Sequence, residues 1–163
     1  MEAFQFFTKL DQTLLLGLRA TTIQELLIGI RSVPDASIYF HTHRFLHQHH
    51  FLSPEPPNDF AYWVANVLVE DALAERLWSI DPVRFDGISG LREKLIGVLE
   101  SHLASTDRRI ECVAGEEFHF MACKTFVLPT GHSARTLGEF AQVVSKVSIN
   151  SVYFHVFDAK MRL

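Results

Sequence analysis

The chain contains an imperfect internal duplication, which constrains its fold more than any other feature of the sequence. When the sequence is shifted by 114 positions, residues 4–41 align without a gap with residues 118–155. The two segments are identical at twelve of thirty-eight positions, where composition alone would give about two or three. The sequence therefore predicts two copies of one structural unit within a single domain that spans residues 1–163.

Each copy begins with a predicted strand. Residues 4–6 and 118–120 alternate apolar and polar side chains, which is the pattern of a half-buried strand. Both predicted strands run on to a turn glycine, Gly17 or Gly131, where we expect them to stop. Because the two copies are related, we expect these strands to pair antiparallel at the centre of the fold.

Two helices are predicted to follow each strand. Residues 22–25 and 136–139 both read threonine, two intervening residues and glutamate, which is the spacing of a capping box. In that motif the glutamate reaches back to the amide of the capping threonine. Ser37 and Ser151 are the predicted N-caps of the second helices.

Further helices are predicted between the copies. One run begins at residues 58–59, breaks near residues 70–71 and resumes up to residue 78, and another helix spans about residues 89–104. A two-stranded ribbon is not stable alone, so helices must cover it. The predicted fold class is α+β and predominantly α-helical, with two long antiparallel strands covered by about six helices.

One asymmetry between the copies bears on assembly. In the first copy the segment 37–41 is followed by a covering helix, whereas the sequence ends at Leu163 soon after the same segment of the second copy. We expect an apolar surface on the second copy to lack its cover, and burial against a second chain is the simplest remedy. The sequence thus favours a homodimer.

Composition disfavours several functional classes. The net charge is −4 and the fifteen basic residues are dispersed, whereas nucleic-acid and anionic membrane surfaces attract clustered Lys and Arg. No apolar run approaches the length of a membrane span, and the N-terminus does not resemble a signal peptide. We expect a cytoplasmic protein that binds neither nucleic acid nor membrane.

A histidine-rich segment is the first candidate site. Five of the nine histidines lie within residues 41–50. On an α-helix His43, His47 and His50 would lie within an arc of about 60°, and Asp59 follows nearby. The chemical interpretation is a divalent transition-metal site in a metal-dependent hydrolase. The alternative is that these histidines are polar spacers on a packed helix, and no named metal motif is present.

His41 forms a second candidate site with its counterpart His155, together with the neighbouring Tyr39 and Tyr153. One interpretation is a pair that lines a pocket for a small-molecule ligand. The other is that each histidine is buried and bonds a backbone carbonyl at the junction of strand and helix.

The stretch Ser37-Ile38-Tyr39-Phe40-His41-Thr42-His43-Arg44-Phe45, followed by Asn58-Asp59-Phe60 and Trp63, resembles a prokaryotic family described only as a domain of unknown function. Residues 74–77, 80–82 and 151–162 extend the resemblance over most of the chain. The resemblance implies no activity.

Taken together, the duplication, the fourteen phenylalanines and the lack of catalytic motifs favour a non-enzymatic module. We expect it to serve dimeric interaction or small-ligand binding. The alternative is the metal-dependent hydrolase centred on the histidine-rich helix.

Overall fold

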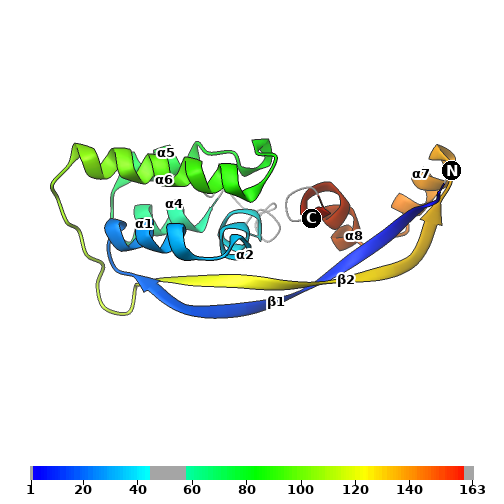
Figure 1. Ribbon diagram of the computed structural model, residues 1–163, viewed down its shortest axis with the longest axis horizontal. Coiled ribbons are helices and arrows are strands. Elements are labelled where there is room, and N and C mark those ends of the chain that lie inside the picture. Colours follow the sequence, from blue (N-terminus) through cyan, green and yellow to red (C-terminus); the bar gives the residue numbers. More distant parts are fainter. Residues whose placement is uncertain (1, 45–57, 160–163) are drawn as a thin grey trace. The chain divides into compact units, whose positions relative to one another are not determined.

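The computed structural model describes residues 2–44 and 58–159, and these have an α+β, mainly helical fold (Figure 1). The predicted fold class is therefore confirmed. The chain forms two compact units. Unit 1 comprises residues 1–12 and 124–163, and unit 2 comprises residues 13–123.

A two-stranded antiparallel ribbon is the only sheet among the described residues. It pairs β1 (Phe4–Ala20) with β2 (Phe118–Ala134). The predicted ends of the strands were wrong, because both strands continue three residues beyond Gly17 and Gly131. These glycines have φ angles of 74° and 76°. Glycine adopts this left-handed conformation without steric cost, so a strand bends there without ending.

Unit 2 contains most of the helices. They are α1 (Ile23–Ser32), α2 (Asp35–Tyr39), the π-helical turn η1 (Phe40–Arg44), α4 (Asp59–Asn66), α5 (Asp71–Trp78), the 3₁₀ turn η2 (Pro82–Arg84) and α6 (Ile88–Ser105). Helix α1 packs against α6, and α4 packs against α5. The core is aliphatic and aromatic, and Leu26, Phe60 and Leu95 are fully buried in it.

One close approach defines how β2 meets α1. The ring of Phe120 lies directly over Gly29, so closely that a Cβ atom on the glycine would overlap the ring. Phe120 is fully buried. Glycine in the middle of a helix costs about 0.5–1 kcal/mol relative to alanine. The cost is offset here by the packing of the ring.

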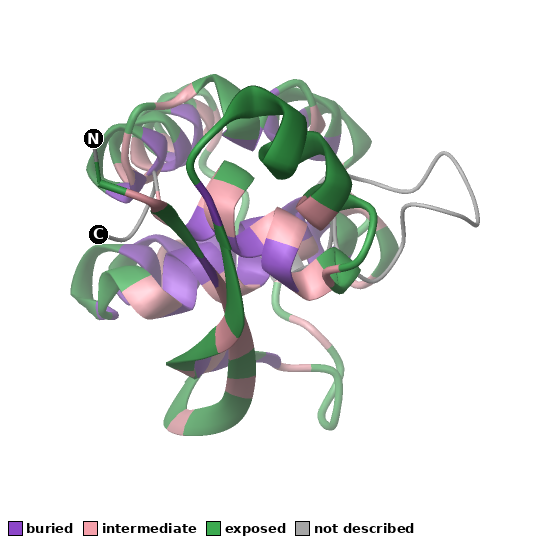
Figure 2. Cartoon of the chain, turned by 90° about the vertical axis from the view of Figure 1, so that its right-hand side faces the viewer, coloured by how far each residue is buried: buried purple, intermediate pink, exposed green. Residues whose placement is uncertain are grey.

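Unit 1 combines the first part of β1 and most of β2 with α7 (Leu137–Val144), α8 (Ile149–Tyr153) and a second π-helical turn, η3 (Phe154–Asp158). Phe6 and Phe154 are buried there. Helix α7, in contrast, has no buried residue and is exposed along its length (Figure 2).

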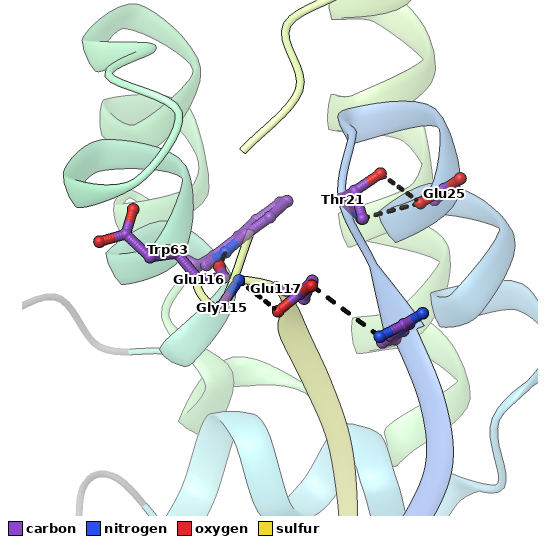
Figure 3. Close-up of polar contacts among 7 residues, drawn as sticks. Thr21, Glu25, Trp63, Gly115, Glu116 and Glu117 are labelled. Carbon is purple, nitrogen blue, oxygen red and sulfur yellow. Dashed lines mark hydrogen bonds and ion pairs between the residues drawn. The ribbon is translucent and has the colours of Figure 1, made fainter. Parts of the chain in front are cut away.

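The predicted capping boxes form in part. Thr22 accepts a hydrogen bond from the Glu25 amide at 3.2 Å, as a capping threonine should. The glutamate, however, accepts from the amide and hydroxyl of Thr21, the residue before the cap, at 2.8 and 2.9 Å (Figure 3). These hydrogen bonds to the ionised form lower the pKa of Glu25. At α7, Glu139 likewise accepts from the Arg135 amide.

The second predicted caps were wrong. Ser37 lies inside α2, whose N-cap is Pro34, and Ser151 lies inside α8, whose N-cap is Ser148. Both helices begin three residues earlier than predicted, which moves both serines into the buried face.

The loop before β2 is held to unit 2 by polar contacts (Figure 3). The indole Nε1 of Trp63 on α4 donates to the Glu116 carbonyl at 2.8 Å. Glu117 accepts from the Gly115 amide at 3.1 Å and lies 3.8 Å from the guanidinium of Arg19 on β1. These bonds fix the start of β2, which lies in unit 2. Among the residues described, no helix is long and apolar enough to span a membrane.

Candidate functional site

Both ring nitrogens of His41 form hydrogen bonds within unit 2. It lies on η1 and is buried. Its Nδ1 is 2.8 Å from Oδ2 of Asp59 at the start of α4, and its Nε2 is 3.0 Å from the Met121 amide nitrogen of β2. Since a backbone N–H can only donate, Nε2 must be the acceptor. The proton is therefore on Nδ1, which donates to the Asp59 carboxylate.

Aromatic side chains enclose the His41 ring. The ring centroids of Phe118 and Phe60 lie 4.8 and 5.4 Å away, and Phe120 meets the ring edge-on at 6.2 Å. This apolar setting holds one histidine tautomer between a strand and a helix.

His155 makes the corresponding contact in unit 1. It lies on η3, and its Nε2 accepts from the Phe7 amide of β1 at 2.9 Å. Ser151 on α8 donates to the carbonyl of the same residue at 2.6 Å. The rings of Phe4 and Phe6 lie 4.9 and 5.8 Å from the imidazole. Burial among these rings lowers the pKa of His155, because it disfavours the charged imidazolium.

The two histidines are thus acceptors for backbone amides. Phe7 and Met121 are themselves 114 positions apart, as are His41 and His155, so the two contacts occupy matching places in the sequence. The sequence predicted a hydrogen bond from each histidine to a backbone carbonyl. This was wrong for Nε2, which in both histidines accepts a hydrogen bond from a backbone N–H. Sequence reasoning missed these partners because no side chain marks them.

Both histidines also lie on π-helical turns. A π-helical turn is rare, and it is often found at functional sites. Here η1 and η3 each begin with phenylalanine and then present the histidine to a strand. Each histidine follows a short α-helix and lies on the wider π-helical turn. From this turn it forms a hydrogen bond with the amide of its strand partner.

The two predicted tyrosines lie beside these turns. The Tyr39 ring stacks on His43, with centroids 4.8 Å apart and planes inclined by 8°. In unit 1 the Tyr153 ring lies 4.7 Å from the ring of Phe157, and the Lys9 ammonium is 4.9 Å from its centroid. Ligand binding by His41, His155, Tyr39 and Tyr153 stays a prediction.

The predicted metal ligands are only partly described. His43 is buried, and its Nδ1 lies 2.9 Å from the Thr42 hydroxyl. Asp59 contacts His41. His47 and His50 lie outside the described residues. Within residues 2–44 and 58–159 there is no group of three His, Cys, Asp or Glu side chains arranged to hold a metal ion. The metal site stays a prediction.

A buried ionic cluster in unit 1 was not predicted. The ammonium of Lys9 lies 2.7 Å from Asp158 of η3 and 3.1 Å from Asp11 of β1, and Thr125 of β2 donates to the latter carboxylate. The side chains of Lys9 and Asp158 are 7% and 2% exposed. Cys123, an uncharged residue, stands 114 positions after Lys9, so the alignment of the two segments gives Lys9 no charged counterpart. The cluster ties β1 to η3.

Comparisons with known proteins identify the family. Residues 1–163 match the "Family of unknown function (DUF5752)", and the chain belongs to this family. Among solved structures, the chain is similar to "The structure of OrfY from Thermoproteus tenax", with 31% sequence identity and a TM-score of 0.86. The similarity covers 98% of this chain and 72% of that chain. A search of the curated proteins found no match.

Proposed function

We propose that this member of the family is a non-enzymatic interaction module that works in the cytoplasm as a homodimer. The observation that supports the proposal is the exposure of α7 in unit 1. This helix is amphipathic, with Leu137, Phe140 and Val144 at the spacing of a buried face, yet none of its residues is buried. Apolar faces left in water are typical of protein–protein contact sites.

The use made of the two histidines supports the non-enzymatic part of the proposal. A general base needs a ring nitrogen that can take a proton from a substrate. In His41 and His155 the Nε2 atom already accepts a backbone N–H. Both side chains therefore join helix to strand, which is a structural task.

The test is the association state of the purified, untagged chain. Sedimentation velocity over a concentration series from about 1 to 100 µM spans the range of a weak to a moderately stable dimer. We expect a dimer at the upper end of this range. A chain that stays monomeric throughout refutes the homodimer.

A second measurement tests the non-enzymatic part. Elemental analysis of protein prepared without chelators gives the metal content, and melting is followed with and without added Zn²⁺ or Mn²⁺. We expect no stoichiometric metal and unchanged melting. One equivalent of a transition metal that is lost in a His43→Ala/His47→Ala variant would instead support the metal-dependent hydrolase.

A further inference from the structure

The backbone of Phe7 in β1 is held on both sides by the last helical segments of unit 1. Its N–H donates to Nε2 of His155 on η3 at 2.9 Å, and its carbonyl accepts from the Ser151 hydroxyl on α8 at 2.6 Å. Two residues further along β1, the Lys9 ammonium lies 2.7 Å from Asp158 of η3. Polar contacts from alternate residues thus join the first part of β1 to α8 and η3.

The tautomer of His155 determines what a further proton does to this junction. Because the Phe7 N–H can only donate, Nε2 is an acceptor and the single proton of the neutral ring is on Nδ1. A second proton can therefore enter only at Nε2. Two N–H groups would then face each other across 2.9 Å, and the hydrogen bond would be lost. His155 accordingly holds β1 only while its ring is neutral.

The immediate surroundings of His155 are aromatic and do not compensate a positive charge. The ring centroids of Phe4, Phe6 and Phe7 lie 4.9, 5.8 and 6.2 Å from that of the imidazole. The ring of Phe154 on η3 lies 5.1 Å away. An imidazolium at this place is poorly solvated, so the charged form favours a state in which η3 has moved away from β1.

The charged and titratable groups on the elements around His155 are engaged elsewhere or exposed. In unit 1 they are Lys9 and Asp11 on β1, Lys124 and His132 on β2, Glu139 on α7 and Asp158 on η3. Lys9 pairs with both aspartates, Glu139 accepts from a backbone amide, and Lys124 lies over a phenylalanine ring. His132 is exposed. Within the described ranges 2–44 and 58–159, none of these groups bonds to the imidazole of His155.

We propose that Phe7, Ser151 and His155 form a proton-operated latch, which opens when Nε2 of His155 takes up a proton and releases the first part of β1 from η3. Opening exposes the rings of Phe6 and Phe154, which are buried while the latch is closed. Histidine protonation is a common trigger of pH-dependent changes in proteins. The latch lies within unit 1 and does not depend on the proposed homodimer.

Thermodynamic linkage gives the size of the effect. In the open latch the imidazole is solvated and has a pKa of about 6.5, whereas burial lowers the pKa of His155 in the closed latch. The open state therefore binds the proton more tightly than the closed state does. Between the two pKa values, each unit fall in pH raises the equilibrium constant for opening by up to about tenfold. Above about pH 6.5 this group gives no pH dependence.

Hydrogen exchange of the Phe7 amide reports on the latch directly, because this N–H is the group that His155 holds. The full chain is isotope-labelled and followed by NMR from about pH 8 to about pH 5. The protection factor compares each rate with that of an unstructured amide at the same pH. We expect the protection of Phe7 to be constant above about pH 6.5 and to fall by up to about tenfold per pH unit below it. Constant protection over the whole range overturns the latch.

Low concentrations of urea distinguish a local opening from global unfolding. A local opening exposes little surface, so about 1 M urea should change the exchange rate of Phe7 by less than about twofold. Amides of α1 in unit 2 that exchange through global unfolding should accelerate about tenfold or more. If Phe7 accelerates as much as they do, β1 is released only when the whole chain unfolds, and the latch is wrong.

Two matched variants identify the titrating group. In His155→Gln the side-chain oxygen can still accept the Phe7 N–H but does not titrate, so the protection of Phe7 should lose its pH dependence. His132→Gln, at an exposed position of the same unit, should keep it. A pH dependence that persists in His155→Gln or disappears in His132→Gln overturns the assignment. The imidazole nitrogens of the wild type give a readout without any substitution, since NMR at about pH 8 should show the proton of His155 on Nδ1, and a proton on Nε2 excludes the latch.

Discussion

Replacing Gly29 by alanine tests the packing of β2 on α1 most directly. An alanine Cβ at this position would overlap the Cζ and Cε2 atoms of Phe120 and lie 3.1 Å from Cε1. The ring is fully buried, and Phe118 lies against it with ring centroids 5.0 Å apart. The Phe120 ring is therefore surrounded by packed side chains and cannot change its position without displacing its neighbours.

Two opposing effects decide the sign of the change. Alanine is the better helix former, which by itself would stabilise the protein by about 0.5–1 kcal/mol. Overpacking a well-filled core costs typically about 1–3 kcal/mol. Because Phe120 has no space to retreat, we expect a net destabilisation of about 1–2 kcal/mol. For a chain of this size that corresponds to a fall in Tm of about 2–8 °C.

The matched control is Gly97→Ala in the middle of α6, where a Cβ would meet nothing within 4 Å. This change should gain the helix propensity alone, raising Tm by about 1–4 °C. Both variants are compared with the wild type by thermal and urea unfolding, followed by circular dichroism. In a Phe120→Leu background, Gly29→Ala should become much less costly, which a double-mutant cycle measures. If Gly29→Ala stabilises the chain as much as Gly97→Ala does, the proposed ring contact is wrong.

Three further changes have defined outcomes. Burial lowers the folded-state pKa of His155 below the unfolded value of about 6.5. The stability that the neutral ring contributes is therefore fully present above about pH 6.5 and is lost as the pH falls through the folded-state pKa. Urea midpoints measured from pH 8 to pH 5 should fall more steeply in the wild type than in a His155→Gln variant, and equal slopes would contradict this. Asn58→Ala removes both the N-cap hydrogen bond of α4 and a buried hydrogen bond to the Leu77 carbonyl. It should lower the free energy of unfolding by about 2–4 kcal/mol, measured by urea unfolding. A loss below about 1 kcal/mol would mean that water replaces both hydrogen bonds. Thr22→Ala removes the cap of α1 and should cost about 1 kcal/mol in the same assay, with Thr22→Ser near the wild type as control.

The sequence predicted those parts of the fold that depend on neighbours in the chain. Alternating phenylalanines placed the starts of β1 and β2, and the threonines at positions 22 and 136 placed the starts of α1 and α7. These signals are local, since a cap or an alternation involves only a few consecutive residues. The ends of the strands were predicted wrongly at Gly17 and Gly131, because glycine is found both where a strand ends and within a strand that continues.

The partners of the candidate site could not be predicted in this way. His41 was singled out as a buried histidine, but its strand partner is the Met121 amide, 80 residues away, and every residue except proline has such an amide. Similarly, nothing near Lys9 in sequence marks Asp158 as its partner. These contacts form between residues that are far apart in the chain, and a single sequence does not show which distant residues come together in the fold.

The bond between His155 and Phe7 also affects how the chain is made. The residues that hold the first strand of unit 1 in place lie 148 positions downstream. At roughly 5–20 residues per second, a ribosome needs about 7–30 s to reach them. During that interval the phenylalanines at the start of β1 have no native partner in η3, so unit 1 cannot close until η3 has been synthesised.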